Sequence, residues 1–486
     1  MELRRPHPIH ILENTTKYFY LLLLPLIRGF LSFRGGLYRW LSGAWFDLLI
    51  LFAILMMAVL RWAFTRYTFD RNGICINRSF ILNQRSYLPY KRLTTVYIEA
   101  PLYFRPFRAV RLKADTDGGY LRRTDFSITL SRKEAVALFE RAQTVFRENE
   151  TIKKSYRPQW FYLAILSLIT SNTLSGVVFV ATLISQSGDL LGKEFEDRLV
   201  VTLTDLAQVL AFGLPPAAAL LAYILLGGWL ISFLMNTVRH IRFHVLRQGK
   251  SMEIRTGIFT TRCYAIHTDR INLVELRQSM ITKLLGFFTV FIHCSGYGKQ
   301  KNELSVLIPA ADRYEVHRNL KVLLPEFPII PKQYRPKARA LSRFLIPPIT
   351  AVFCVLALFG TLYLLFPQFR ELIFFVGIMA ELPTVWWMLV RLFSFFHTGI
   401  GKENGIYTFY YTYAYGFFTA SVPEERISQL HCRQTLFQRM SHCCDIVILS
   451  YSEGRRRLVV PNIPIAEANE LFDFCFFDNI HLQKGK

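Results

Sequence analysis

Apolar and polar stretches alternate along this chain in a regular order. Long apolar runs come in three pairs, and a long polar block follows each pair. The runs are residues 17–33, 44–64, 160–184, 206–238, 344–366 and 372–396. A membrane-spanning helix needs about 20 mostly apolar residues, so the pattern predicts six transmembrane helices in three hairpins. The first run is short and carries Arg28, which favours a tilted or re-entrant segment.

The polar blocks have the pattern of small β domains. Runs such as residues 252–258, 407–412 and 445–451 alternate or are rich in β-branched and aromatic residues, which predicts strands. Each block closes with a helix-like segment, at 132–146, 310–324 or 465–472. We therefore predict an α+β membrane protein in which each hairpin is followed by a small β-barrel or sandwich with a C-terminal helix. The predicted parts are 1–64 (transmembrane hairpin 1), 65–157 (domain 1), 158–238 (hairpin 2), 239–343 (domain 2), 344–396 (hairpin 3) and 397–486 (domain 3).

A repeated motif marks the second and third blocks. Residues 270–286 read RINLVELRQSMITKLLG and residues 426–442 read RISQLHCRQTLFQRMSH, and the two align without a gap. A fainter copy begins at Arg92, where Ala100 and Pro101 replace the Gln and the hydroxyl residue. This recurrence indicates a repeat architecture. The candidate binding residues of the motif are Arg270, Arg277, Gln278, Ser279, Arg426, Arg433, Gln434 and Thr435.

The sequence leaves two interpretations of the motif open. Its side chains form a donor cluster for phosphate or carboxylate groups of lipids or of a partner. Alternatively they form a network of ion pairs and turn caps that the fold requires, for example Arg270 with Asp269 or Glu275. In an extended segment neither face of the motif is purely apolar, so we expect it to be partly exposed, with residues 277–279 at a turn.

Composition and charge favour a membrane location. The 486-residue chain is 52% hydrophobic, has a mean hydropathy of +0.25 and still carries a formal charge of +23. Nucleic acid or an anionic membrane surface explains such an excess of basic residues, and the hydropathy favours the membrane. Basic residues cluster where the apolar runs meet the polar blocks, whereas the loop 185–205 is mainly acidic. The positive-inside rule therefore places the three blocks and both termini in the cytoplasm.

The chain carries no recognisable catalytic or metal-binding signature. Its eight cysteines form no CxxC pair, and the adjacent Cys443 and Cys444 would point to opposite faces of a strand. The sequence contains no Walker A loop, no GxSxG and no HExxH. We therefore expect a protein that is not an enzyme, with no cofactor and no bound metal.

Two further features are candidates for membrane-related roles. Glu381, followed by Pro383, lies near the middle of the sixth apolar run. An intramembrane carboxylate serves a proton or ion relay, or is a protonated group hydrogen-bonded to a neighbouring helix backbone. The apolar and aromatic segments 102–107 and 284–288 stand beside basic residues and suit contact with the membrane interface, with ordinary domain core as the alternative.

The repeats resemble a known family. Three copies of an apolar pair followed by a domain with Arg-Ile and then Arg-Gln-Ser/Thr are similar to the membrane-flanked bacterial PH-like proteins (DUF304) of the YdbS/YdbT type. The three-copy length is closest to the YdbT type, and the resemblance covers nearly the whole chain. It implies a PH-like β-barrel with a C-terminal helix in each block. It also implies a non-enzymatic protein of the bacterial cytoplasmic (inner or plasma) membrane.

The leading hypothesis is a multi-pass membrane protein whose three cytosolic PH-like domains act as a binding or scaffold module. The expected partners are anionic membrane lipids, together with a protein partner such as a smaller PH-like membrane protein, or further copies of the chain in a homo-oligomer. Nucleic acid is not an expected partner, because the basic blocks show no RRM or helix-turn-helix pattern. The alternative hypothesis is a component of a transporter, exporter or resistance system with Glu381 in its path.

Overall fold

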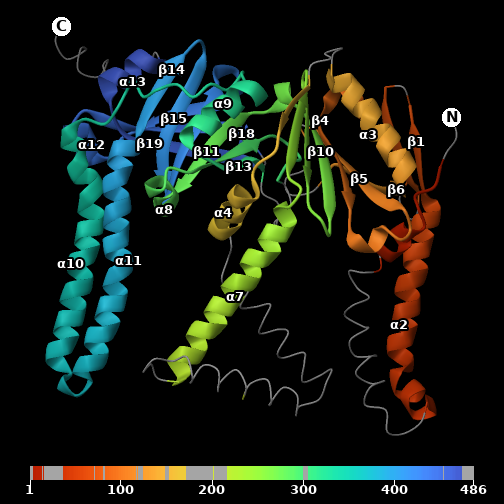
Figure 1. Cartoon of the computed structure of the whole chain (residues 1–486), viewed down its shortest axis with the longest axis horizontal. Helices are drawn as coiled ribbons and strands as arrows, with labels where there is room; N and C mark the ends of the chain where they lie inside the picture. Colours follow the sequence, from red (N-terminus) through yellow and green to blue (C-terminus); the bar gives the residue numbers. More distant parts are fainter. Residues whose placement is uncertain are drawn as a thin grey trace. The chain divides into compact units, whose positions relative to one another are not determined.

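The chain folds into two compact units of mixed helix and sheet (Figure 1). Unit 1 comprises Met1–Tyr120 and Thr124–His267, and unit 2 comprises chiefly Thr268–Lys486. The structure is a computed structural model and describes residues 4–13, 15, 37–70, 72–79, 83–116, 118, 124–147, 153–170, 201, 216–298, 305–452 and 454–472.

Unit 1 contains two antiparallel sheets. The smaller sheet has the order β1-β2-β3, and the larger has the order β6-β5-β4-β10-β9-β8-β7. The strands are β1 (Thr65–Phe69), β2 (Gly73–Ser79), β3 (Asn83–Pro89), β4 (Leu93–Ala100), β5 (Ala109–Thr116), β6 (Phe126–Ser131), β7 (Lys153–Tyr156), β8 (His244–Gln248), β9 (Ser251–Thr256) and β10 (Thr261–His267). Helix α3 (Arg132–Arg147) packs on them, and its Phe139 and Phe146 join Leu93 and Leu112 in one buried core.

Unit 2 repeats this plan with a longer helical part. Its sheets have the orders β13-β12-β11-β16-β15-β14 and β17-β18-β19. The strands are β11 (Leu273–Ser279), β12 (Phe288–His293), β13 (Val306–Ala311), β14 (Gly399–Glu403), β15 (Ile406–Tyr413), β16 (Gly416–Pro423), β17 (Ile427–Arg433), β18 (Cys443–Ser452) and β19 (Gly454–Pro464). The helices are α8 (Met280–Leu284), α9 (Arg313–Leu323), α10 (Leu341–Leu365), α11 (Arg370–His397), α12 (Leu436–Met440) and α13 (Ile465–Phe472). Phe409, Ile446, Leu458 and Leu471 are among the residues of the core between its sheets and α13.

Neighbouring repeats share their sheets. Strand β4 of the first polar block pairs with β10 of the second, and β11 of the second block pairs with β16 of the third. The first three strands of a block and its next three strands therefore belong to different sheets. As a result, β8–β10 of the second block lie in unit 1, whereas β11–β13 lie in unit 2. The six-part division expected from the sequence stays a prediction.

A buried carboxylate ties each shared sheet together. In unit 1, Glu99 of β4 pairs with Lys113 at 2.8 Å and with Arg262 of β10 at 3.0 Å. In unit 2, Glu275 of β11 is fully buried and accepts a hydrogen bond from the Tyr411 hydroxyl of β15 at 3.1 Å. Arg262 and Tyr411 belong to a different repeat from the carboxylate that each contacts, whereas Lys113 belongs to the same repeat as Glu99. These contacts add to the backbone ladder that joins the repeats.

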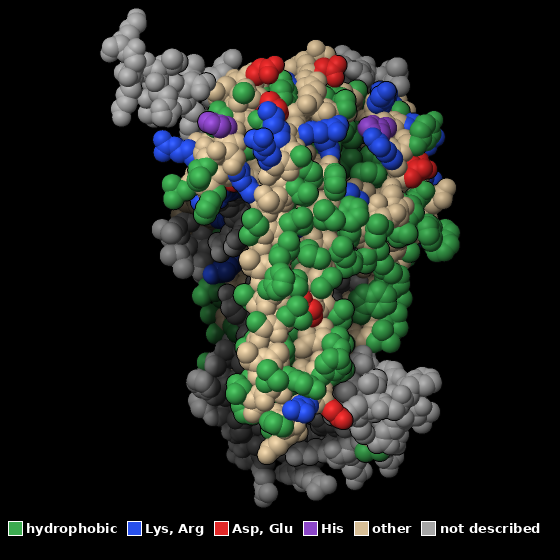
Figure 2. Space-filling model, turned by 90° about the vertical axis from the view of Figure 1, so that its left-hand side faces the viewer, with side chains coloured by type: hydrophobic (Ala, Val, Ile, Leu, Met, Phe, Trp, Pro, Cys, Tyr) green, Lys and Arg blue, Asp and Glu red, His purple; other side chains and the backbone are tan. Residues whose placement is uncertain are grey.

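The predicted arrangement of six transmembrane helices is wrong. In the part of the chain that the structure describes, two helices are long and apolar enough to cross a membrane, Ala338–Leu365 and Ile373–His397. They correspond to α10 and α11, which form an antiparallel hairpin (Figure 1). Figure 2 shows hydrophobic side chains spread over this face, and Phe353 and Leu364 on the hairpin are 65% and 73% exposed.

The other predicted runs are described only in part. Residues 171–184 of the third run and 206–215 of the fourth lie outside the described residues, and the described part of the third run is helix α4 (Trp160–Thr170). Helices α2 (Leu37–Phe64) and α7 (Pro216–His240) supply the shorter apolar stretches Phe52–Phe64 and Leu225–Val238. The first predicted run, residues 17–33, lies outside the described residues. Within the described residues, two of the six predicted runs therefore meet the criterion for a membrane span.

Candidate functional site

The Gln of the repeated motif has the same role in both copies. The Gln278 side-chain amide donates to the carbonyl of Phe287 at 3.0 Å, and Gln434 donates to the carbonyl of Cys443 at 2.8 Å. Both acceptors lie nine residues further along the chain, where the chain returns after a short helix. The amide therefore closes the connection between two paired strands. This contact serves the fold in both repeats.

The hydroxyl residue of the motif begins a short helix. The Ser279 side chain accepts a hydrogen bond from the backbone N–H of Thr282 and caps α8. Thr435 accepts in the same way from Gln438 and caps α12. Both helices have a capping box, in which the third helical residue bonds back to the cap. The motif thus ends a strand and starts a helix.

The arginines of the motif differ between the copies. The Arg277 guanidinium lies 3.9 Å from the ring centroid of Phe291 and forms an ion pair of 3.4 Å with Glu275. Arg433, its counterpart, is exposed on β17. Arg426 donates to the backbone carbonyl of Asp269, and Arg270 is half-buried at the end of a 3₁₀ turn. Strand β11 is largely buried rather than partly exposed, because β16 covers its edge. Phosphate or carboxylate binding by these residues stays a prediction.

The two capped helices expose apolar side chains. On α8 and just after it, Ile281, Leu284 and Leu285 are exposed, whereas Met280 is buried. In the third repeat, α12 exposes Leu436, Phe437 and Met440. In the first repeat, the segment after β4 exposes Leu102, Tyr103 and Phe107. Each repeat thus exposes three apolar residues in the segment after its fourth strand. Grouped exposed apolar residues of this kind mark interaction surfaces. The segments expected at the membrane interface thus expose part of their apolar side chains, whereas Phe104 is buried.

In unit 2 both short helices lie against the base of the α10–α11 hairpin. Met280 of α8 packs in one buried cluster with Val390 of α11 and Phe417 of β16. Arg343 near the start of α10 donates to the carbonyl of Phe437 at 2.8 Å, which fixes α12 there. The exposed apolar residues of α8 and α12 consequently lie beside the helices that meet the membrane criterion.

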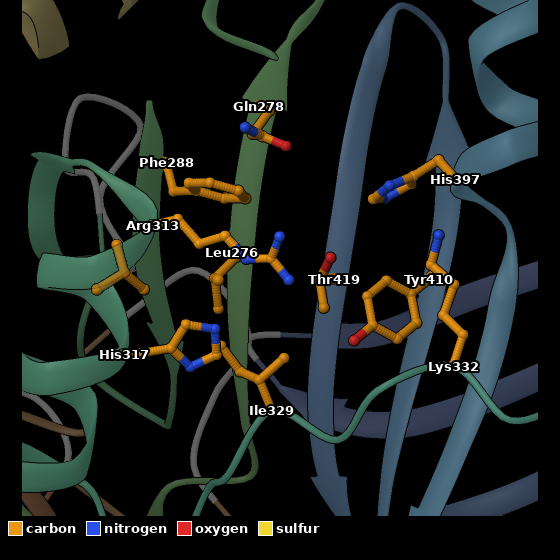
Figure 3. Close-up of a pocket in the computed structure, with 11 residues that line it drawn as sticks. Leu276, Gln278, Phe288, Arg313, His317, Ile329, Lys332, His397, Tyr410 and Thr419 are labelled. Atoms are coloured by element: carbon orange, nitrogen blue, oxygen red, sulfur yellow. The ribbon is translucent and has the colours of Figure 1, made fainter. Parts of the chain in front are cut away.

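A pocket of about 220 Å³ opens on the six-stranded sheet of unit 2 (Figure 3). Arg313 and His317 of α9 line one side, and Lys332 and His397 line the other, with Thr419 of β16 between them. The further lining residues are Leu276, Gln278, Phe288, Val316, Ile329 and Tyr410. None of the described residues that line the pocket is acidic. The pocket therefore combines cationic and hydrogen-bonding groups with an apolar wall.

Two half-buried lysines concentrate positive charge at this pocket. Lys332 donates to the carbonyl of Phe396, at the end of α11, at 2.9 Å. Lys283 of α8 lies 3.8 Å from the ring centroid of Phe417. Burial, and then the charge of Lys332, lower the pKa of Lys283 to about 8. Burial, and then Arg335, lower the pKa of Lys332 to about 8. A bound anion would stabilise both ammonium groups.

Sequence reasoning missed this pocket. Arg313, His317 and Lys332 belong to no motif, and they meet Thr419 only because β11 pairs with a strand more than a hundred residues away. Among the predicted site residues, Gln278 alone lines it. The available signal was the absence of nearby acidic residues around Lys332 in the sequence KQYRPKAR, which is a weak one.

Glu381 lies in the middle of α11 and is half-buried. One of its carboxylate oxygens accepts a hydrogen bond from the Thr384 hydroxyl at 3.0 Å, and the same hydroxyl donates to the Glu381 carbonyl at 2.7 Å. The other carboxylate oxygen, Oε2, is buried without a hydrogen-bond partner among the described residues. The described residues contain no group of three or more His, Cys, Asp or Glu side chains able to hold a metal.

Comparison with known proteins agrees with this architecture. Residues 21–144 and 201–324, together about half of the chain, match the family model described as "Bacterial PH domain". The UPF0699 transmembrane protein YdbT of Bacillus subtilis (strain 168) is 23% identical over 321 residues, which are 61% of this chain and 64% of that protein. The match thus spans less than two thirds of that relative. No solved structure matches. The chain belongs to the bacterial PH domain family and is a membrane protein with PH-like domains.

Proposed function

We propose that this chain is a non-enzymatic binding and scaffold module held at the membrane surface, and that unit 2 binds an anionic group of a lipid headgroup. The observation that carries the proposal is the pocket beside the α10–α11 hairpin. Arg313 and Lys332 line it, Lys283 lies near it, and none of its described lining residues is acidic. A phosphate group accepts hydrogen bonds from all of these donor types.

The position of the pocket favours a lipid over a free ion. Lys332 contacts the last residues of α11, and α8 and α12 expose apolar side chains beside the same hairpin. Apolar groups at that depth insert among the headgroups and acyl chains, while the cations meet phosphate. We place the sheets on the cytoplasmic side of the bacterial inner membrane, because Arg339, Arg343 and Arg391 lie at that end of the hairpin.

Lipid binding by the purified full chain tests this proposal. The probes are nanodiscs of phosphatidylglycerol, nanodiscs of phosphatidylcholine, and inorganic phosphate added to the phosphatidylcholine sample. We expect the affinity for phosphatidylglycerol, measured by native mass spectrometry, to fall more than about a hundredfold in Arg313→Gln with Lys332→Gln, since each of the two charge-assisted hydrogen bonds contributes about 1.5–3 kcal/mol.

The matched control is Lys321→Gln, which removes a charge from the exposed face of α9 without touching the pocket. Equal phosphatidylglycerol binding by the double variant and this control contradicts the proposal. If inorganic phosphate saturates the pocket and phosphatidylglycerol is not preferred, the pocket binds anions but the proposal of a lipid ligand is wrong.

A second candidate function is a component of a transporter or exporter, favoured by the unpartnered oxygen of Glu381. The test is transport or resistance in a strain that lacks the native protein and carries Glu381→Gln, with Thr384→Val as the control for local packing. A loss of activity limited to Glu381→Gln supports a relay. Full activity removes Glu381 from the mechanism.

A further inference from the structure

Two strand edges at the ends of the repeat array lack, among the described residues, the inter-repeat partner that their equivalents have. Strand β3 is the outer strand of the sheet β1-β2-β3, and β17 is the outer strand of β17-β18-β19. An outer strand presents a row of backbone N–H and C=O groups that another strand can pair with. The two edges lie in different repeats, at the beginning and the end of the array.

The equivalent strands of the other repeats are paired. Strands β3, β10 and β16 are each followed directly by a 3₁₀ turn that ends in Arg, at Arg92, Arg270 and Arg426. Strands β4, β11 and β17 then follow these turns. Inside the chain β4 pairs with β10 and β11 pairs with β16, always joining one repeat to the next. Only β17 and β3 lack this partner in the described structure.

Both internal pairings use the same register. Val96 of β4 stands opposite Ala265 of β10, and Val274 of β11 stands opposite Ser421 of β16. Val96 and Val274 lie four residues after the turn arginine, and Ala265 and Ser421 lie five residues before it. The pairing is therefore a property of the repeat and not of one particular sequence.

Burial follows this pairing. In β4 and β11 nearly every residue is buried, whereas four of the seven residues of β17 are exposed. In β16 most residues are buried, whereas the first five residues of β3 are exposed, including Tyr87 at 54%. The end strands thus expose the groups that are covered in the middle of the array.

We propose that β17 of one copy of this chain pairs antiparallel with β3 of a second copy, in the register of the internal pairings. That register places Leu430 opposite Tyr87. Leu430 lies four residues after Arg426, and Tyr87 lies five residues before Arg92. It then follows that His431 stands opposite Ser86, and Arg433 stands opposite Gln84.

The side chains of the two edges are compatible in this register. Arg85 faces Cys432 and Arg433 faces Gln84, so no two like charges stand directly opposite one another, an arrangement that would be destabilising. Leu430 and Tyr87 form an apolar cross-strand pair. The contact joins two different surfaces, so it repeats from copy to copy and closes into a ring or continues as a row. It does not depend on the anion pocket.

Disulfide trapping in native membranes tests the proposal with full-length chains. One tagged copy carries Gln84→Cys, a second copy with another tag carries Arg433→Cys, and both carry Cys432→Ser to remove the native thiol of β17. Opposite Cβ atoms of antiparallel strands lie about 4.5–5.5 Å apart, so mild oxidation should join the two tags. The control replaces Arg433→Cys by Gln429→Cys, about 13 Å away along the strand, and should give no product.

A charge test measures the same contact without thiols. Ser86→Lys with His431→Lys sets like charges opposite one another at two exposed positions, and should reduce the oligomer seen by mass photometry in nanodiscs several-fold. Ser86→Glu with His431→Lys should restore it.

Three results overturn the proposal. The first is no joined product from the Gln84→Cys and Arg433→Cys copies. The second is an equal yield from the Gln429→Cys control. The third is a disulfide that forms only within one chain when that chain carries both cysteines, because β17 would then pair with its own β3.

Discussion

The second and third repeats carry the same motif in two different surroundings. In the second repeat it lies on β11, which has a strand on each side, and its neighbour Glu275 is fully buried. In the third repeat it lies on β17, whose outer edge is uncovered in the described residues, and His431 at the position of Glu275 is exposed. Gln278 and Gln434 keep the same contact in both places, whereas Arg277 and Arg433 do not. The comparison indicates that the fold requires the Gln contact, whereas the surroundings of the Arg differ from repeat to repeat.

The largest expected difference concerns the position of Glu275 and His431. Glu275→Ala leaves the buried Tyr411 hydroxyl and the His293 ring, 2.8 Å away, without their acceptor. We expect a loss of about 3–5 kcal/mol in the free energy of unfolding. His431→Ala, at an exposed site, should change it by less than about 0.5 kcal/mol. Urea unfolding of the detergent-solubilised chain measures both, and similar losses would contradict the difference in burial.

The next effect should be alike in the two repeats. Gln278→Ala and Gln434→Ala each remove one side-chain hydrogen bond to a buried backbone carbonyl. We expect each to lower the free energy of unfolding by about 1 kcal/mol. The same urea titration checks this. A large loss in one repeat and none in the other would show that the Gln is not a common requirement of the fold.

The arginines should separate stability from binding. Arg277→Ala removes a stacked, ion-paired guanidinium and should cost about 1 kcal/mol of stability. Arg433→Ala should leave stability unchanged and weaken the capture of partners or of second copies in a pull-down from membranes. If the double variant Arg277→Ala with Arg433→Ala captures partners as well as the wild type does, these two arginines have no role in binding.

The last effect, on the pH dependence of stability, concerns Lys283 and its exposed counterpart Arg439. Burial and Lys332 lower the pKa of Lys283 to about 8 in the folded chain, against 10.5 as the ordinary value. Between these pH values the unfolded chain binds more protons, so stability should rise as the pH increases through this window. Lys283→Met should reduce that rise, whereas Arg439→Met should not. Thermal unfolding between pH 7 and 10 checks the sign. An unchanged rise in Lys283→Met contradicts it.

Local structure was predictable where one element carries its own signal. The closing helix predicted at 465–472 is α13 (Ile465–Phe472), and those predicted at 132–146 and 310–324 correspond to α3 and α9. The predicted strand at 407–412 lies within β15 (Ile406–Tyr413). The turn expected at residues 277–279 is wrong for Arg277 and Gln278, which are paired residues of β11, and the chain leaves the strand only at Ser279, the cap of α8.

The sharing of sheets and the pocket could not be predicted. Alternation along β4 shows that it is a strand but not which distant edge it joins, because the backbone ladder between β4 and β10 uses groups that any strand has. Lys332 meets Thr419 in the pocket through a different long-range pairing, that of β11 with β16. Hydropathy predicted six spans, and among the described helices α10 and α11 meet the criterion for a span.

Strands shared between repeats also set the order in which the chain can fold. Strand β4 leaves the ribosome far ahead of β10, because Val96 and its partner Ala265 are far apart in the sequence. At about 5–20 residues per second, β4 waits roughly 10–30 s for its neighbour. During that time its edge is open to any strand nearby, including the β10 or β16 of another nascent chain on the same messenger. Synthesis rate and chaperone cover over this interval should therefore decide whether repeats join within one chain or between chains.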